Sequence, residues 1–394
     1  MEKASSNLIV VLLLFLVSNT LGYFGFDELV VRHEFGEVSD RIVEGEKAAK
    51  HSIPWQVQLR KCQKVNKTDF EYSLMKQILN WKSEKKSSKN FIVTKDPDNG
   101  VKEYKICRRG CGGTIIDEYH ILTAAHCVVE VEQNSDPATS TTNSTTKLLQ
   151  AFQGLTKTPM SAENLMIAVG EHDTTDWEVQ KNHRVHKVHV HSKWNPHSMI
   201  NTSTDMYDYA VLELECNQKI HFGRMAQPAC LPKRGDHLKY MNPGTVFNIS
   251  GWGSQDDMVH VNYSPILKVG QLQYTQHQEE SHSTMFASDI DESGHAVCAG
   301  DSGGPLTWKD GNKWKVVGIN SAGFNFRRDE NGNLKHLIDI LPEISEEDFL
   351  KCNRKELAFA IVENQLDWIE AIVKNCKCGG DRQRSCGKVC STRH

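Results

Sequence analysis

The apolar residues of this chain come in short runs from about Ile42 to Ile340. Typical runs are WQVQL, LMIAVG, AVLEL and WKVVGI, and Gly, Asn, Asp and Pro recur between them. Short runs with an alternating or continuous apolar pattern, bounded by turn residues, are typical of β-strands. Many such strands favour an all-β sandwich or a pair of barrels over βαβ units. The 394 residues, 39% of them hydrophobic, suffice for one large core or two smaller ones.

The N-terminus has the three parts of a secretory signal peptide. Lys3 precedes the apolar run LIVVLLLFLV, and SNTLG follows it. The apolar run is about ten residues long, whereas a membrane-spanning helix needs about 20, so a signal anchor is disfavoured. We therefore expect residues 1–22 to be a signal peptide and the protein to be secreted to the extracellular space. The formal net charge of -4 gives no electrostatic footprint for nucleic acid or a membrane surface, and we expect neither partner.

The twelve cysteines fit export, because the secretory pathway oxidises thiols to disulfides. Asn-x-Ser/Thr sequons are candidate glycosylation sites in that compartment. The five sequons begin at Asn66, Asn143, Asn201, Asn248 and Asn262. Sequons also arise by chance, so the sequence predicts the sites and not their occupancy.

Two polar stretches interrupt the strand pattern and predict surface insertions. The first, at about 61–109, is rich in lysine, and the second, at about 130–160, contains QNSDPATSTTNSTT, which predicts a mobile loop. Near the C-terminus, NQLDWIEAIVKN places Leu366, Ile369 and Val373 on one face of a helix. A basic tail with four cysteines follows at 376–394, and local disulfides are favoured there over a zinc site.

Three short motifs carry candidate catalytic side chains. In HAVCAGDSGGP, glycines flank Ser302 and permit a tight turn with outward-pointing N–H groups. That geometry suits a nucleophile beside an oxyanion hole, although the pattern alone also fits a plain glycine-rich turn. LTAAHC places His126 at the end of a strand-like run, and DYAVLEL places Asp208 just before another. A disulfide between Cys111 and Cys127, 16 residues apart, would hold the loop of the histidine.

These motifs, together with GWG at 251–253 and RIVEG from Arg41, resemble the trypsin/chymotrypsin-like (S1 family) serine endopeptidases. The resemblance covers about 42–373, with insertions, and the motifs stand in the family's order. It implies an all-β fold of two six-stranded antiparallel β-barrels and a C-terminal helix, with the catalytic groups in the cleft between the barrels. It also implies protein or peptide substrates, serine protease inhibitors as partners, and no cofactor.

The resemblance assigns a role to each residue of the motifs. Ser302 would attack the peptide carbonyl, His126 would take its proton, and Asp208 would orient the imidazole. The backbone N–H groups of Gly300 and Ser302 would form the oxyanion hole.

The resemblance also implies an inactive precursor. Cleavage after Arg41 would free the α-amino group of Ile42, which would pair with Asp301 and order the oxyanion hole. Residues 23–41 would then be an activation propeptide, and 42–375 the protease domain. We expect a separate trypsin-like protease as the activator, because a buried guanidinium must be paired in an acidic pocket.

The chain departs from the family's pattern around the substrate pocket. Ala296 stands six residues before the nucleophile, where trypsin-like specificity has Asp, and Val297 follows it. Ala322 replaces the Trp of the family's SWG, between Ser321 and Gly323. No carboxylate is therefore expected at the bottom of the substrate pocket to pair with Lys or Arg. We expect the pocket to take a small or apolar residue before the cleaved bond, and its predicted residues are Ala296, Val297, Ser321 and Gly323.

Cysteines and metal ligands depart from the family as well. Phe247 and Ala287 stand where the family has cysteines, and the partners of those cysteines are absent too. Cys298 lacks its usual partner, for which Cys352 is a candidate replacement. Family members often bind calcium in the loop after GEH, at positions like Glu171, but the loop is short here and we expect no metal. The histidines of HRVHKVHVH point alternately to opposite faces of a strand, which disfavours a metal site of His183, His186, His189 and His191.

The motifs also allow two other interpretations. An α/β-hydrolase also carries G-x-S-x-G, but its catalytic order is Ser, Asp/Glu, His, and only His336 and His394 follow Ser302 here. A catalytically silent binding protein on the protease fold is the alternative from another class. Such proteins usually lack a triad residue, whereas this chain has all three.

Overall fold

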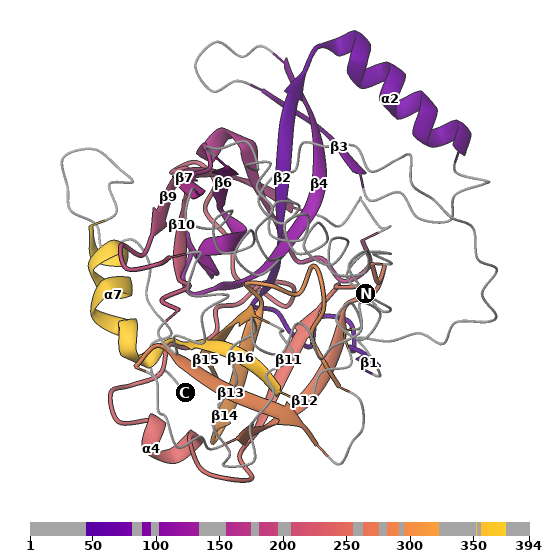
Figure 1. Cartoon of the computed structure of the whole chain (residues 1–394). Coiled ribbons are helices and arrows are strands. Elements are labelled where there is room, and N and C mark those ends of the chain that lie inside the picture. Colours follow the sequence, from indigo (N-terminus) through magenta and orange to yellow (C-terminus); the bar gives the residue numbers. More distant parts are fainter. Residues whose placement is uncertain are drawn as a thin grey trace, which may run out of the picture.

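Two β-barrels form the body of the molecule in this computed structural model, the first in the upper part of Figure 1 and the second in the lower part. The structure describes residues 45–80, 89–95, 102–133, 155–174, 181–195, 206–254, 263–275, 282–290, 295–322, 352 and 356–375. The predicted signal peptide, propeptide and C-terminal tail lie outside these residues. No helix within the described ranges is long and apolar enough to cross a membrane.

The first barrel is closed by six antiparallel strands. Their order is β2-β8-β9-β10-β5-β4, and β2 pairs with β4 to close the barrel. A seventh strand, β3, adds to the N-terminal part of β4. The bounds are β2 Gln56–Val65, β3 Lys89–Lys95, β4 Lys102–Ile115, β5 His120–Thr123, β8 Leu165–Val169, β9 Lys181–Val190 and β10 Ala210–Leu214.

The second barrel repeats this design. Its order is β12-β11-β14-β15-β16-β13, closed by pairing of β12 with β13, and the short β1 adds to β12. The bounds are β1 Glu46–Lys47, β11 Val246–Gly251, β12 Lys268–Thr275, β13 Thr284–Asp289, β14 Pro305–Asp310, β15 Lys313–Ala322 and β16 Glu356–Ile361. The two closed six-stranded barrels confirm the predicted fold class, and the strand-like runs lie in β2, β8, β10 and β15.

The apolar pattern of each strand reflects how it is buried. β5, β8 and β10 are buried along their whole length, whereas β12 alternates between buried and more exposed residues. The largest apolar cluster joins Leu122 and Val211 of the first barrel to Val316 and Ile319 of the second. The barrels therefore share a core, and their facing sides are held at a fixed distance.

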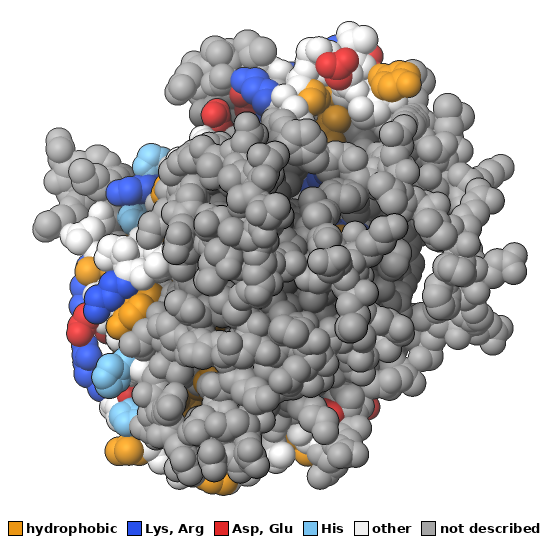
Figure 2. All heavy atoms as spheres, in the orientation of Figure 1, with side chains coloured by type: hydrophobic (Ala, Val, Ile, Leu, Met, Phe, Trp, Pro, Cys, Tyr) orange, Lys and Arg blue, Asp and Glu red, His pale blue; other side chains and the backbone are white. Residues whose placement is uncertain are grey.

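The predicted C-terminal helix is present. α7 spans Leu366–Lys374, directly after the 3-10 turn Glu363–Gln365, and its residues Leu366, Ile369 and Val373 are buried as predicted. Ile369 and Val373 pack into the shared core of the two barrels. The outer side of α7 is charged, and side chains of both signs are visible along this edge in Figure 2.

The described parts of the first insertion extend the first barrel. β2 and β4 continue as a long hairpin that carries β3 and α2 (Lys67–Asn80), and this extension stands away from the barrels in Figure 1. A disulfide between Cys62 and Cys107 crosses the hairpin. Asn66 caps α2, because its Oδ1 accepts the N–H of Asp69 at 2.8 Å. The sequence predicted the insertion but neither its strands nor its disulfide.

The remaining elements are short. β6 and β7 pair on either side of the Ser/Thr tract, whose residues after Gln133 lie outside the described part of the chain. The bounds are β6 Val129–Gln133, β7 Leu155–Pro159 and α4 His237–Tyr240, with 3-10 turns at Ala125–Cys127 and Ala162–Asn164.

Candidate active site

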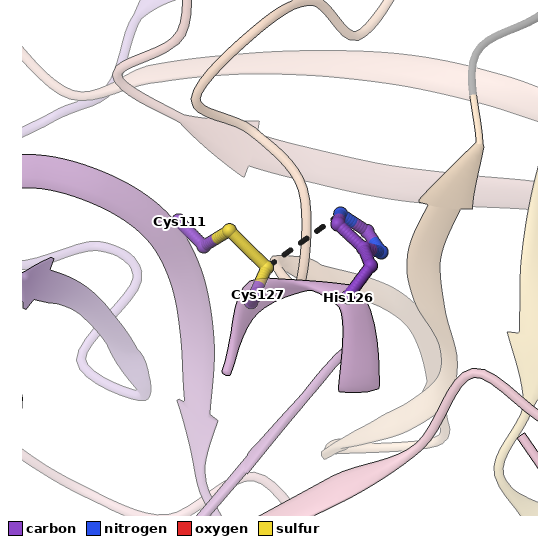
Figure 3. Close-up of side chains that lie close together, drawn as sticks. All are labelled: Cys111, His126 and Cys127. Atoms are coloured by element: carbon purple, nitrogen blue, oxygen red, sulfur yellow. Dashed lines mark hydrogen bonds between the residues drawn. A yellow bond between two sulfur atoms is a disulfide. The ribbon is translucent and has the colours of Figure 1, made fainter. Parts of the chain in front are cut away.

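His126 lies on the 3-10 turn that follows β5 and is 5% exposed. Its neighbour Cys127 forms a disulfide with Cys111 of β4, as predicted (Figure 3). The disulfide fixes the turn covalently to the wall of the first barrel. The histidine is therefore presented by a short, constrained segment.

Asp208 lies just before β10 and is fully buried. Its Oδ2 is 2.7 Å from Nδ1 of His126, and its Oδ1 accepts the backbone N–H of the same histidine at 2.9 Å. The hydroxyl of Ser321, in β15 of the second barrel, donates to Oδ2 at 2.6 Å. Burial disfavours the charged carboxylate, but the charge and hydrogen bonds from His126 and Ser321 outweigh it and lower the pKa of Asp208. Asp208 thus engages Nδ1 and leaves Nε2 of the imidazole for other chemistry.

One group of metal-ligand types occurs among the described residues, and it lies at this turn. Ligand atoms of Cys111, His126 and Cys127 are within 4.8 Å of one another, and Cys127 Sγ is 3.7 Å from His126 Nε2 (Figure 3). Cysteine binds metals as a thiolate, and both sulfur atoms here are held in the disulfide. This group is therefore a disulfide beside a histidine and does not form a metal centre.

Ser302 lies on a tight turn that leads into β14. Gly300 and Gly303 have φ angles of +97° and +75°, which glycine adopts without strain. A Cβ atom on Gly303 would collide with the hydroxyl of Thr123, the last residue of β5. The turn from the second barrel therefore packs against the first-barrel segment that carries His126.

The groups around Ser302 are free to meet a substrate. No hydrogen bond joins Ser302 Oγ to His126 Nε2, although both residues are described. Within the described part of the chain, the N–H groups of Gly300 and Ser302 have no acceptor. Such N–H groups beside a half-buried hydroxyl can receive an oxygen that gains negative charge. Catalytic hydrogen bonds often tighten only when substrate is bound.

Asp301 is 3% exposed, and the protein surrounds its carboxylate closely. The carboxylate accepts the N–H groups of Gly253 at 2.8 Å and Cys298 at 3.0 Å. A Cβ atom on Gly251 or Gly253 would collide with it, so GWG is a cradle for this side chain. Burial raises the pKa of Asp301, the two N–H groups lower it, and burial has the larger effect, so that the pKa is about 6. No described residue forms an ion pair with Asp301. The sequence flagged GWG only as a motif and did not predict this contact.

The predicted substrate pocket is described in part. Ala296 and Val297 are buried, and Val297 belongs to the core of the second barrel. Ser321 was predicted to line the pocket, yet its hydroxyl contacts Asp208, which the motif SAG did not signal. Three of the residues predicted for activation or for the substrate pocket lie outside the described residues, namely Arg41, Ile42 and Gly323.

A second disulfide flanks the turn of Ser302. Cys298, two residues before Gly300, is bonded to Cys352, which confirms the candidate pairing. Phe247 and Ala287, which stand at family cysteine positions, are fully buried in the second barrel, where they pack as apolar side chains.

Two of the four candidate histidine ligands have protein partners at hydrogen-bond distance. His183 Nδ1 lies 2.7 Å from the backbone O of Gln218, and His189 Nε2 lies 3.2 Å from a carboxylate oxygen of Glu213. Among the sequons, Asn66 and Asn248 are described, and their glycosylation stays a prediction.

Glu171, at the position where family members bind calcium, forms a buried ion pair with Arg60 at 2.8 Å. Burial raises the pKa of Glu171, against the charges of Arg60 and Arg109, which lower it. The guanidinium competes with any cation for this carboxylate. That the loop binds no metal stays a prediction.

Comparisons with known proteins agree with this architecture. A family model described as Trypsin matches residues 99–158 and 156–340. The chain is 28% identical over 223 residues to mannan-binding lectin serine protease 1 of Mus musculus, which covers 54% of this chain and 28% of that protein. It is 30% identical over 204 residues to ovochymase of Halocynthia roretzi, and the match covers 50% of this chain and 11% of that protein. It is 26% identical over 247 residues to coagulation factor XI of Bos taurus, and the match covers 61% of this chain and 33% of that protein.

This chain therefore spans a third or less of the length of these relatives. The family model, in contrast, matches more than half of the chain, and it does so on a fold of two closed six-stranded barrels. The chain belongs to the trypsin family.

Proposed function

We propose that the protein is a secreted serine endopeptidase that is made as an inactive precursor. The observation that carries this proposal is the 2.7 Å contact between His126 Nδ1 and the buried Asp208, on the segment against which the Ser302 turn packs. A serine hydroxyl is a weak nucleophile at neutral pH, and an imidazole oriented by a carboxylate is the group that activates it.

The proposed reaction proceeds through an acyl-enzyme. Ser302 Oγ attacks the carbonyl carbon of the scissile bond while its proton moves to His126 Nε2. Asp208 stabilises the imidazolium, and the N–H groups of Gly300 and Ser302 bind the oxyanion. His126 then gives the proton to the leaving amine, and water hydrolyses the ester by the same steps in reverse.

Asp301 motivates the inactive precursor. Its buried carboxylate has a raised pKa and two N–H donors, and no described residue gives it a cation. Cleavage after Arg41 would create an ammonium group on Ile42 that pairs with Asp301 and fixes the adjoining Gly300. Ala296 offers arginine no carboxylate, so a separate trypsin-like protease is the proposed activator.

The proposed pocket takes a small or apolar residue before the cleaved bond. Its buried wall of Ala296 and Val297 would leave a substrate cation unpaired. Proteins or peptides are the proposed substrates, and serine protease inhibitors would bind to the same groups.

A catalytically silent protein on the same fold is the second candidate. The observation that favours it is that Ser302 Oγ and His126 Nε2, both described, do not form a hydrogen bond. In that case the cleft would bind a partner without cleaving it.

Fluorophosphonate labelling of the Arg41-cleaved protein tests the proposal. We expect one adduct on Ser302 and cleavage within a peptide library, and neither in Ser302→Ala. A folded, processed protein that neither labels nor cleaves would establish the silent alternative. The precursor, mixed with a trace of active enzyme, is expected not to release a new N-terminus at Ile42. Accelerating, Ser302-dependent release would contradict the proposed pocket.

A further inference from the structure

Asn320 is a polar residue with an unsatisfied side chain beside the proposed nucleophile. It lies in β15 and is 5% exposed. Its Oδ1 is buried and has no hydrogen-bond partner among the residues that the structure describes. Buried acceptors without a partner are uncommon, because they lose hydrogen bonds to water that nothing replaces. Such an acceptor beside a reactive group indicates a place where a ligand supplies the donor.

The backbone of Asn320 is bonded to the turn of Ser302. Its N–H donates to the O of Gly304 at 2.9 Å, and its O accepts the N–H of Gly303 at 2.8 Å. Asn320 therefore lies directly across from the two residues that follow Ser302. A substrate held at Ser302 comes within reach of this part of β15.

The side chain of Asn320 points into the second barrel. A Cβ atom on Gly318, two residues earlier in β15, would meet Leu306 and Phe359 of the second-barrel core, and residues two apart in a strand share a face. Asn320 also stands directly opposite Phe359 in the pairing of β15 with β16, so the two side chains share a face. Phe359 is fully buried in an apolar cluster that includes Val297.

Asn320 directly precedes Ser321 of the proposed substrate pocket. In that pocket, a peptide carbonyl bound at the N–H groups of Gly300 and Ser302 would project the preceding side chain between the segment 296–299 and the end of β15. That segment contributes the buried Ala296 and Val297. Leu357 is fully buried in the same apolar cluster as Val297.

We infer that Asn320 selects substrates whose residue before the cleaved bond has a short side chain with a hydrogen-bond donor, such as Ser, Thr or Asn. The inference rests on the proposed protease function and narrows its small or apolar preference. Apolar walls accept the carbon atoms of the side chain, and Oδ1 of Asn320 accepts its proton. A polar site that loses its substrate donor discriminates strongly against the apolar analogue of that substrate.

Matched peptide pairs test this inference. Thr and Val have nearly the same shape and differ in one hydroxyl, so the two peptides differ only in that residue. Processed enzyme is given both peptides in competition, and the ratio of their kcat/KM values is measured by mass spectrometry. We expect wild type to favour Thr by at least about tenfold. We expect Asn320→Leu, which keeps the branched shape and the number of heavy atoms and removes the acceptor, to bring the ratio to one or below.

Two further variants keep the test decisive. Asn320→Val also removes the acceptor, with a shorter side chain of one heavy atom fewer, and it serves if the leucine variant does not fold. Asn217→Leu changes an exposed asparagine in the first barrel and is expected to keep the wild-type ratio. Fluorophosphonate labelling of Ser302 is followed in every variant. Labelled wild-type enzyme that favours Val, or a labelled Asn320→Leu that keeps the Thr preference, overturns the inference alone. Wild type that does not label overturns the proposed protease function, and this inference with it.

Discussion

Asp208 and Asp301 are both buried beside the candidate active site, yet the protein treats their charges in opposite ways. Asp208, contributed by the first barrel, has His126 and Ser321 as partners, and its pKa is lowered. Asp301, contributed by the second barrel, has two backbone N–H groups as partners, and its pKa is raised to about 6. Burial raises both pKa values, so the difference comes from the partners. Folding alone gives the carboxylate of Asp208 partners that lower its pKa. The carboxylate of Asp301 keeps a raised pKa, and no described residue gives it a cationic partner.

Replacing Asp208 should have the largest effect. We expect Asp208→Asn to lower kcat of the processed enzyme by about 10⁴-fold, because an amide that donates to Nδ1 selects the wrong tautomer of His126. Steady-state kinetics on a peptide from the library measures it.

Asp117→Asn is a matched control for this change. Asp117 and His120 form a second, fully buried pair at 2.8 Å, which is not part of the candidate site. We expect its loss to affect stability but not kcat of the folded fraction. Equal losses of kcat in both variants would mean that Asp208 acts only through the fold.

Replacing Asp301 sharpens the other side of the comparison. The folded pKa of about 6 lies above the ordinary value of 3.8, so folding favours the protonated form. This contribution to stability is present below about pH 4 and is lost as the pH rises through about 6. In an Arg41→Gln precursor, Asp301→Asn should therefore raise the free energy of unfolding by about 3 kcal/mol at pH 7 and not at pH 4. Urea unfolding across this pH range measures the difference. A destabilisation by Asp301→Asn that grows from pH 4 to pH 7 would show that Asp301 already has a cationic partner.

Replacing Ser321 should have the smallest effect of the three. Ser321→Ala removes one hydrogen bond to Asp208 and leaves both bonds from His126, so we expect kcat to fall by about tenfold. The pH profile of kcat/KM should change as well, because the carboxylate loses a donor that lowers its pKa. Ser250→Ala is the control, since this buried hydroxyl binds Gln56 at 2.8 Å and is not part of the candidate site. An unchanged kcat in Ser321→Ala would return Ser321 to the pocket wall that the sequence predicted.

Much of the fold could be predicted because its signals are local. The runs that became β2, β8, β10 and β15 carry the strand pattern within a few residues, and α7 carries the helical spacing of Leu366, Ile369 and Val373. The extension of β2 and β4 could not be predicted, because lysine-rich segments do not show the pairing that makes them strands.

The sequence by itself named His126, Asp208 and Ser302 as candidates and predicted the bond between Cys111 and Cys127, and its resemblance to a family implied the two barrels. The strand patterns and motifs on which these predictions rest are properties of residues that are neighbours in the sequence. Only the tertiary structure decided that Ser321 turns to Asp208, at an irregularity in the pairing of β15 with β16, while Asn320 faces the second barrel and its Oδ1 has no partner among the described residues. The physical reason is that the neighbour that each face of a strand meets depends on a register, and on bulges in it, set by strands distant in the chain.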